Sequence, residues 1–433
     1  MATEKFDAIV VGAGPSGAAA ALTMARGGLN VVLVERGEAP GAKNVFGGIV
    51  YKWPLENLIP KFWEKAPIER RVIDHRMVVL NRGSGFAISY KDEYFGEEAR
   101  GGFTALRSKF DPWLAQQAEE AGATIVTAMP VSSVIKENGR VIGIRAGEGK
   151  ENELYANAVV AADGVMSTVL DKAGIRGPPA PDEVAIGVKE IVELPADTID
   201  ARFNTKRGFG ARLEFFGAVT RGKSGSGFVY TNSNTLSVGV AVVLSHLMQL
   251  KSKPYELLDE FKTHPYVAPL IEGGRAKEYQ AHLIPSGGYQ SIPPLVSSGV
   301  LAVGDAAMLC LYPEGTNMAM ASGMMAGQAL VAAKKSGDFS DSKLMGYQRL
   351  MEQSYVLKEH KRKKGYHSAF LNDERFFTAY PEVISETMRD ILVVDGVDKG
   401  VKHAAARKRI RSKVGYLRLL RDMYSDVWSV LPW

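Results

Sequence analysis

The chain has 433 residues, 46% of them hydrophobic, and a formal net charge of +5. This length exceeds that of one simple domain, and the hydrophobic content is enough for a substantial core. The mild positive charge does not by itself imply nucleic-acid binding. The single cysteine, Cys310, excludes disulfides within the chain and any iron–sulfur cluster held by its own thiolates.

The N-terminal segment predicts a complete βαβ unit. Residues 6–11 form an apolar, β-branched run typical of a buried parallel strand. A glycine turn from Gly12 to Gly17 follows, and the alanine-rich stretch 18–26 predicts a helix. Gly27-Gly28 ends that helix, and a second strand is expected over 30–35.

Later elements alternate between strands and helices, and the last part of the chain is helical. Residues 184–243 are rich in strands and glycine turns, which predicts a separate antiparallel sheet. From Ser342 onward the pattern is mostly helical and increasingly basic. The remaining expected elements are helices at 111–121, 254–264 and 316–334, strands at 124–128, 158–162 and 300–303, and a hairpin around Asn138-Gly139.

The glycine turn has the spacing of a dinucleotide-binding motif. Gly12 permits the tight turn, Gly14 lets backbone N–H groups approach a pyrophosphate, and Gly17 allows close packing of helix on strand. The helix N-terminus favours the negative charge of the phosphates. Glu35 ends the second strand, where a carboxylate can accept from both ribose hydroxyls, although a solvated strand-end residue is the alternative.

Two later motifs favour FAD over NAD. Gly304-Asp305 follows a short apolar strand, where the carboxylate can accept from a ribityl hydroxyl. The segment from Pro313 to Met318 opens a long helix whose first N–H groups are free to face a ligand. Such a helix end stabilises the negative charge of a reduced flavin. An ordinary capped helix is the alternative interpretation of this segment.

Two further features are less specific. Ala162-Asp163-Gly164 follows a buried strand and could be another turn on the cofactor side, or a generic strand end. Arg107 precedes the helix at 111–121 and could reach phosphate or ribityl oxygens, although a lone arginine is more often a surface residue.

Two longer stretches give the chain a family resemblance. They are Gly41-Ala42-Lys43-Asn44-Val45-Phe46-Gly47-Gly48 and Ser286-Gly287-Gly288-Tyr289-Gln290-Ser291-Ile292-Pro293-Pro294. Together with the three glycine motifs, they resemble the FixC branch of the electron-transfer-flavoprotein:quinone oxidoreductases. The shared motifs alone are also similar to aromatic hydroxylases and geranylgeranyl reductases. The resemblance covers nearly the whole chain and is weakest in the C-terminal segment.

The resemblance implies an α/β fold with three parts. The first is a discontinuous Rossmann-like FAD-binding domain of the aromatic-hydroxylase/glutathione-reductase type, expected over 1–80, 105–183 and 276–341. An inserted antiparallel β-sheet domain for quinone is expected over 81–104 and 184–275. The third part is a helical, basic C-terminal region over 342–433 that contacts a partner or a membrane.

The resemblance also implies an activity and partners. The family takes electrons from an electron-transfer flavoprotein and passes them through FAD to a membrane quinone. Because Cys310 cannot ligate a cluster alone, the FixC-type arrangement is expected: two electron-transfer-flavoprotein subunits, alpha and beta, and a small ferredoxin-like subunit with a 4Fe–4S cluster. Such assemblies bifurcate electrons from NADH. A prenyl-chain reductase of the geranylgeranyl reductase type and a passive FAD-holding relay subunit are the alternatives.

The candidate site residues follow from the motifs and the resemblance. No nucleophile, acid–base pair or metal constellation stands out, so no catalytic or metal-ligating residue is predicted. In the strand from Ser224 to Tyr230, the quinone candidates are Gly225, Ser226 and Phe228, with an ordinary β-turn as the alternative. The FAD candidates are Gly12, Gly14, Pro15, Ser16, Gly17, Glu35, Arg36, Lys43, Asn44, Gly47, Gly48, Arg107, Val131, Ala162, Asp163, Gly164, Gly304, Asp305, Gly315, Thr316, Asn317 and Met318.

Two segments are candidates for membrane contact. Tyr51 to Trp63 combines tryptophans and aliphatic residues with two lysines, and Val401 to Arg421 is basic without acidic residues and has Ile410 and Val414 at helical spacing. Trp428 and Trp433 follow. Basic amphipathic helices suit anionic lipid surfaces or acidic partners; a solvated helix is the alternative. We expect a peripheral protein on the cytoplasmic side of the membrane, without signal peptide or membrane span.

Overall fold

The chain forms two compact units. The computed structural model describes residues 5–42, 47–147, 152–365, 371 and 373–415. Unit 1 comprises residues 1–71, 95–184 and 283–364, and unit 2 comprises 72–94, 185–282 and 365–433. The helical region that begins near Ser342 is therefore divided between the two units at residue 364.

Unit 1 is built on a mostly parallel sheet with β1 (Lys5–Val11) near its centre. On one side of β1 lie β2 (Val31–Val34) and β7 (Thr124–Val126); on the other lie β10 (Glu153–Ala161) and β17 (Val300–Ala302). All these neighbours pair in parallel. The carboxyl ends of the strands consequently meet at one edge, where ligands bind in open α/β sheets.

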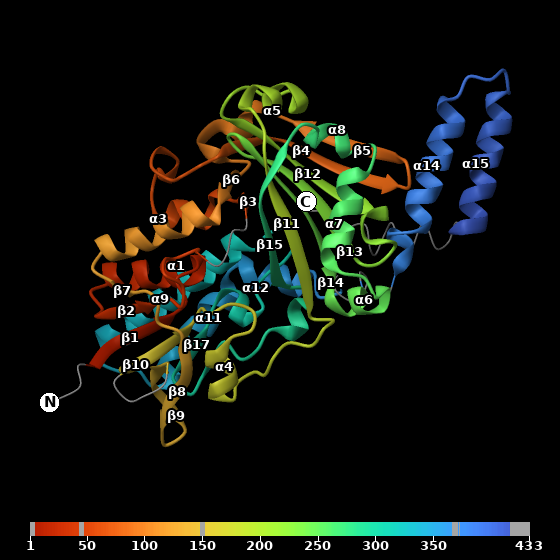
Figure 1. The fold of residues 1–433 in the computed structure, drawn as a ribbon. Helices are drawn as coiled ribbons and strands as arrows, with labels where there is room; N and C mark the ends of the chain where they lie inside the picture. Colours follow the sequence, from red (N-terminus) through yellow and green to blue (C-terminus); the bar gives the residue numbers. More distant parts are fainter. Residues whose placement is uncertain (1–4, 43–46, 148–151, 366–370, 372, 416–433) are drawn as a thin grey trace. The chain divides into compact units, whose positions relative to one another are not determined.

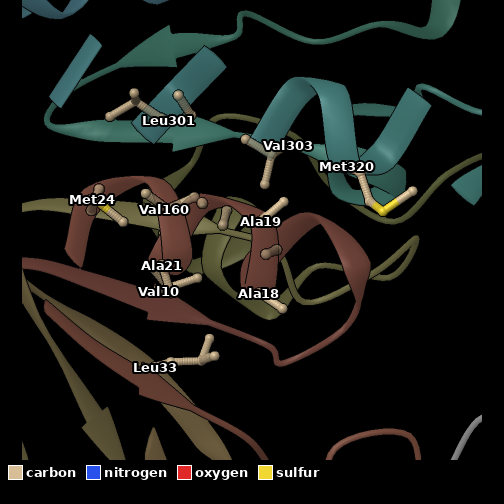
Figure 2. Close-up of a cluster of buried hydrophobic side chains, with 14 of the residues drawn as sticks. Val10, Ala18, Ala19, Ala21, Met24, Leu33, Val160, Leu301, Val303 and Met320 are labelled. Atoms are coloured by element: carbon tan, nitrogen blue, oxygen red, sulfur yellow. The ribbon is translucent and has the colours of Figure 1, made fainter. Parts of the chain in front are cut away.

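Two helices of small residues in unit 1 pack closely on each other. In α1 (Pro15–Arg26), Ala18 to Ala21 are completely buried. Helix α9 (Thr316–Ser336) approaches α1 so closely that a Cβ atom at Gly323 would lie 1.9 Å from the carbonyl oxygen of Ser16. Figure 2 shows Ala18, Ala19, Ala21 and Met24 among Val10, Leu33, Val160 and Leu301 of the strands. The alanine-rich sequence thus reflects helix packing at short range.

The remaining elements of unit 1 extend this framework. β8 (Val131–Glu137) and β9 (Arg140–Ala146) form the expected hairpin around Asn138-Gly139, and β9 continues antiparallel onto β10. The others are β3 (Gly47–Val50), α2 (Lys52–Leu58), η1 (Phe62–Glu64), η2 (Glu93–Ala99, which begins at the end of a unit 2 segment), β6 (Phe103–Leu106), α3 (Arg107–Glu120), α4 (Thr168–Ala173), η4 (Gly288–Ser291), β16 (Val296–Ser297), η5 (Gly304–Ala307), α10 (Asp341–Leu344), α11 (Gly346–Gln353) and α12 (Tyr355–Arg362).

Unit 2 is built on an antiparallel sheet. Its strands lie in the order β15 (Arg275–Pro285), β11 (Val184–Glu193), β14 (Thr235–Val243), β13 (Gly225–Thr231), β12 (Phe209–Gly217) and β4 (Arg70–Asn81), and β5 (Ser84–Lys91) pairs with β4. Alternate residues of β12, β13 and β14 are apolar and buried, as in Leu213, Val229 and Val238. The strand-rich pattern over 184–243 had predicted this sheet.

Helices complete unit 2. Leu257, Leu258 and Phe261 of α7 (Pro254–Thr263) pack into the apolar core of the sheet. The chain ends, within the described residues, in the antiparallel pair α14 (Ala379–Leu392) and α15 (Lys399–Lys413), drawn in blue in Figure 1. The other elements are α5 (Ala196–Phe203), η3 (Ala218–Thr220), α6 (Leu244–Leu250), α8 (Ala268–Ile271) and η6 (Glu374–Phe376).

Candidate functional site

The glycine turn after β1 leaves no space for a side chain at Gly12 or at Gly17. Gly12 has φ +101°, and a Cβ atom there would lie 2.4 Å from the carbonyl oxygen of Ala162. At Gly17 a Cβ atom would lie 1.9 Å from the carbonyl oxygen of Gly12. Gly14 is the N-cap of α1, Pro15 follows it, and no side chain caps the helix. The first N–H groups of α1 are therefore available to an anionic group.

Glu35 lies at the end of β2, next to this turn. Its Oε2 accepts a hydrogen bond of 2.9 Å from the Ala13 backbone N–H, and its Oε1 accepts one of 2.7 Å from the Gly37 N–H. These two bonds fix the carboxylate beside the glycine turn. Each oxygen keeps acceptor capacity for a hydroxyl group, which suits recognition of a ribose.

Arg107 belongs to the same site. It begins α3, and its guanidinium bonds to both carboxylate oxygens of Asp111, at 2.5 and 2.6 Å. Its Nη2 lies 3.5 Å from the position that a Cβ atom would take at Gly14. The arginine therefore places a positive charge beside the glycine turn. Asp111 was not predicted as a site residue, although its spacing of four residues from Arg107 on one helix is a signal for such a pair.

In the turn at Ala162-Asp163-Gly164, the Asp163 carboxylate binds groups of the residues that follow it. Asp163 accepts hydrogen bonds from the Ser167 hydroxyl at 2.6 Å and from the Val169 N–H at 3.0 Å, so it caps α4. Burial raises the pKa of this carboxyl group. The side of the turn that meets the glycine motif is the backbone of Ala162, which lies against Gly12. Gly164 has φ +82° and open space around it.

The Gly304-Asp305 turn lies against both α1 and α9. Gly304 has φ +57°, its N–H donates to the Ser322 hydroxyl at 2.9 Å, and a Cβ atom there would lie 2.6 Å from the Ser16 hydroxyl oxygen. Asp305 is partly buried. Its enclosure raises its pKa to about 6, and the charge of Arg107 opposes that rise. The two residues are thus near enough to interact electrostatically.

The N-terminus of α9 has an open polar end. Gly315 is the N-cap, and no side chain caps the helix. Glu314 accepts hydrogen bonds from the Asn317 amide at 2.5 Å and from the Tyr355 hydroxyl. Asn317 is buried, and its Oδ1 has no hydrogen-bond partner among the described residues. An orphaned acceptor beside free helix N–H groups suits a ligand with both acceptor and donor atoms.

The remaining FAD candidates are distributed unevenly. Gly47 and Gly48 begin β3 and pair with Leu106 and Ala105, which directly precede Arg107. Arg36 is exposed, Val131 begins β8 and is partly buried, and Met318 is buried in the core of unit 1. Lys43 and Asn44 lie outside the described residues.

These residues match the parts of FAD. Glu35 suits the ribose, the N-terminus of α1 suits the pyrophosphate, and Arg107 suits the polar groups between the two ends. Asp305 suits a ribityl hydroxyl at the flavin end. The open end of α9 suits the electron-rich edge of the flavin. When bound, FAD supplies one- and two-electron transfer, while the described residues bind and orient it. No group of three or more His, Cys, Asp and Glu side chains in the described part of the chain could hold a metal ion.

The quinone candidates lie on β13 in unit 2. A Cβ atom at Gly225 would lie 2.3 Å from the carbonyl oxygen of Ala241, so neighbouring backbone occupies its missing side-chain position. Ser226, Phe228 and Tyr230 alternate along the strand and share one face of the sheet. The rings of Phe228 and Tyr230 stack with centroids 4.8 Å apart.

A charged pair lies on the same face of the unit 2 sheet. In the register of β12 with β13, Arg212 faces Tyr230 and Glu214 faces Phe228. Glu214 accepts from the Arg212 guanidinium at 2.9 Å and from the Tyr230 hydroxyl at 2.5 Å. The opposite face carries Leu213 and Val229 in the apolar core. One face of this sheet is thus polar and aromatic, and the sequence pattern had not indicated the charged pair.

One candidate for membrane contact is used inside unit 1. Leu55, Leu58, Ile59 and Phe62 are buried in the core, and Trp53 and Trp63 pack against it, so the apolar residues of the 51–63 segment do not form an exposed surface. Of the other candidate, Val401 is exposed, whereas Val414 is buried. None of the described helices combines the length and apolar character that a membrane span needs.

The fold and the site define a flavin-dependent oxidoreductase. Residues 7–175 match the family model of FAD-dependent oxidoreductases, which agrees with the dinucleotide cradle in unit 1. The cofactor is therefore FAD, as predicted. The chain belongs to the FixC family of electron-transfer-flavoprotein:quinone oxidoreductases, because relatives named Protein FixC share 39% to 42% identity with it over 98% of the chain. Residues 366–429 also match the ETF-QO/FixC C-terminal domain, and residues 184–284 match the ETF-QO ubiquinone-binding domain.

Relatives and solved structures agree with this assignment. The chain is 42% identical to Protein FixC of Bradyrhizobium diazoefficiens and 39% identical to Protein FixC of Escherichia coli strain K12, each over 98% of both chains. A geranylgeranyl bacteriochlorophyll reductase-like protein of Thermoplasma acidophilum has a similar structure, with a TM-score of 0.69, 22% identity, and coverage of 98% of this chain and 99% of the other. The myxobacterial halogenase CndH has a TM-score of 0.62 at 17% identity, covering 99% and 98%. These two likenesses concern the fold alone.

Proposed function

We propose that this protein accepts electrons from an electron-transfer flavoprotein on its FAD and passes them to a membrane quinone. The observation that carries the proposal is the combination in one chain of a dinucleotide cradle in unit 1 with a match to a ubiquinone-binding domain over 184–284. The named FixC relatives span the same length. The polar, aromatic face of β12 and β13 supports the proposal, because a quinone head group has a flat ring and two carbonyl acceptors.

The proposal extends to the partners. Two electron-transfer-flavoprotein subunits, alpha and beta, deliver the electrons, and a small ferredoxin-like subunit carries the 4Fe–4S cluster that Cys310 alone cannot ligate. In this assembly electrons from NADH are bifurcated between ferredoxin and quinone. The sequence has one strand-backed GxGxxG motif, Gly12 to Gly17, which supports electron delivery by a partner over direct reduction by NADH. We place the assembly peripherally on the cytoplasmic side of the membrane.

The proposal also assigns individual residues to the FAD and quinone sites. Gly12, Gly14, Gly17 and Glu35 bind the adenine-dinucleotide end, and Arg107 lies between the two ends. Asp305 and the segment from Gly315 to Asn317 bind the flavin end. Ser226 and Phe228 contact the quinone, and Gly225 acts through the backbone packing of β13.

The test is anaerobic rapid mixing of the purified, photochemically reduced protein with a short-chain ubiquinone analogue. We expect rapid return of the oxidised flavin spectrum with one quinol formed per flavin. NADH alone should bleach the flavin slowly, and addition of the two electron-transfer-flavoprotein subunits should accelerate bleaching. Flavin that quinone cannot reoxidise would indicate a passive relay, and saturation of a prenyl chain would indicate a prenyl reductase. Rapid bleaching by NADH alone would overturn the partner-fed scheme.

A further inference from the structure

The end of α14, the start of α15 and the loop between them expose a group of aliphatic side chains. Val394 is 91% exposed, Leu392 70% and Val401 60%, and Val393 and Val397 are also exposed. Single apolar residues on a surface need no explanation. Five of them lie within ten consecutive residues at the end of the helical hairpin that is drawn in blue in Figure 1. Together they form an apolar patch of the kind that marks an interaction site. We call these five residues the hairpin tip.

The charged side chains next to the hairpin tip have partners within the hairpin. Asp395 pairs with the Lys402 ammonium at 2.6 Å, and Asp398 caps α15 by accepting from the Gly400 N–H at 2.8 Å. Lys399 and Lys402 each donate, at 2.6 Å, to a backbone carbonyl at the end of α14. Both carboxylates and two carbonyls therefore have partners that remain when water leaves the tip, which lowers the cost of transfer to an apolar medium.

The helix behind the tip is strongly basic. α15 has seven Lys and Arg residues and no Asp or Glu. Arg409 and Lys413 pair with acidic residues of α14 and so hold the hairpin together. Lys408 and Arg411 are exposed and make no ion pair within the described residues. Positive charge of this kind complements an anionic surface.

The apolar surface extends from the tip along α14. Leu392 also lines a cleft of about 370 Å³ between α14 and β5, together with Ile384, Met388 and Phe86. Phe86 and its strand neighbours Ile88 and Tyr90 are exposed on alternate positions of β5, and hence on one face. The hairpin therefore presents aliphatic groups at its tip and an apolar flank beside it.

We propose that the hairpin tip inserts into the interface of an anionic lipid bilayer, with Lys408 and Arg411 at the level of the head groups. Branched aliphatic side chains with adjacent cations are the combination that partitions into a lipid interface. The five side chains of the tip are all aliphatic, and none is an arginine of the kind that anchors protein interfaces, which favours a lipid surface over a protein partner. The inference rests on the proposed function, since it names the element that brings the protein to a membrane quinone.

The test is flotation of the full-length, FAD-loaded protein with vesicles of phosphatidylcholine and phosphatidylglycerol. We expect Val394→Ser with Val397→Ser to lower the fraction bound by about tenfold or more, from the apolar area that two valines lose. Met248→Ser is the matched control, because Met248 is 63% exposed on α6 of the same unit. This control should bind as the unaltered protein does. Equal binding of the double variant and the control would overturn the proposal.

Charge and depth give independent readouts. The double variant Lys408→Glu, Arg411→Glu should abolish the preference for phosphatidylglycerol. The control variant Lys335→Glu, Lys361→Glu makes the same change in net charge on exposed residues of unit 1. This control should keep most of the preference for phosphatidylglycerol. A polarity-sensitive dye on Val394→Cys should shift to the blue with vesicles, and one on Met248→Cys should not. Burial raises the pKa of the Cys310 thiol, so this cysteine should label slowly. No shift at position 394, or a shift only with the partner subunits, would overturn lipid insertion.

Failure of the inference is separable from failure of the proposed function. A water-soluble quinone analogue in the absence of lipid should reoxidise the flavin of the Val394→Ser, Val397→Ser variant at the rate of the unaltered protein. If the unaltered protein binds vesicles but quinone does not reoxidise its flavin, the proposed function fails and the lipid contact stands. If quinone reoxidises the flavin but no vesicle binds the protein, the lipid contact fails alone.

Discussion

Arg107 and Asp111 form a two-point ion pair on the first turn of α3, with the arginine beside Gly14 of the dinucleotide turn. Asp111 is 1% exposed on its side chain and Arg107 14%. A guanidinium so enclosed needs its carboxylate partner to stay in place. The pair thus keeps a positive charge in the site between Glu35 and Asp305, the two carboxylates that we assign to opposite ends of FAD.

We predict that Asp111→Asn weakens FAD binding by roughly ten- to hundredfold. A hydrogen bond to a charged group contributes about 1.5–3 kcal/mol, and the amide leaves Arg107 without a countercharge and free to turn away from Gly14. The measurement is the dissociation constant for FAD, from quenching of flavin fluorescence on binding to the flavin-free protein.

The matched control for this prediction is Glu153→Gln. It removes the carboxylate that pairs with Arg145 in the same unit, on a strand away from the glycine turn. FAD affinity should be unchanged, because Glu153 lies at the start of β10, at the opposite end of the strand from the glycine turn, and this pair does not reach the site. If both variants bind FAD equally well, Arg107 has no role in the site.

Gly17→Ala should abolish FAD binding and lower the stability of unit 1. A Cβ atom at Gly17 would lie 1.9 Å from the carbonyl oxygen of Gly12, so the turn must open to admit it. Overpacking of this kind costs about 1–3 kcal/mol. Gly177→Ala is the control, since nothing lies within 4 Å of that Cβ position. Flavin absorbance per polypeptide and the thermal midpoint report the two effects; normal flavin content in Gly17→Ala would contradict the assignment.

The sequence was sufficient to predict those parts of the site whose residues lie close together in the chain. The βαβ unit places Gly12, Gly17 and Glu35 within 30 residues, so strand, turn and helix signals together predict their arrangement. Asp163 shows the limit of such signals, because an aspartate after a strand can face a ligand or cap the next helix, and here its carboxylate caps α4.

Contacts between distant segments were beyond the sequence pattern. The hydrogen bond of Tyr355 to Glu314 joins α12 to the start of α9 over 41 residues, and no periodicity encodes it. The membrane contact proposed for the aromatic segment 51–63 depended on the same kind of information. Its amphipathic composition suits a lipid surface or a core equally well, and tertiary packing decides between them.

The flavin-free protein should lose stability as pH rises through the range set by Asp305. Burial raises the pKa of this carboxyl group from 3.8 to about 6, so the folded state holds the proton more tightly than the unfolded state. The free energy of unfolding therefore falls by about 2–3 kcal/mol as the pH rises from the unfolded pKa of Asp305 to its folded pKa, and it stays at the lower value at higher pH. Asp305→Asn should remove this dependence while weakening FAD binding. Urea midpoints across this pH range test it, and a variant whose midpoint still falls to the same extent would rule out Asp305 as the cause.

Phe228→Leu should raise the KM for a ubiquinone analogue several-fold and leave the FAD content unchanged. The ring of Phe228 stacks on Tyr230 with centroids 4.8 Å apart, and we expect it to pack against the quinone ring as well. An aromatic pair contributes about 0.5–1.5 kcal/mol beyond its buried area, so loss of the contact with the quinone is worth up to about tenfold in affinity. Leucine keeps the apolar volume, so the change reports the flat ring surface. Tyr279→Leu, at a residue 47% exposed on β15 of the same unit, is the control and should leave KM unaltered. Ferricyanide, which takes electrons without a quinone site, should reoxidise the flavin of all three proteins at one rate. A slower reaction of Phe228→Leu with ferricyanide would instead mean that the substitution acts on the flavin or on the fold.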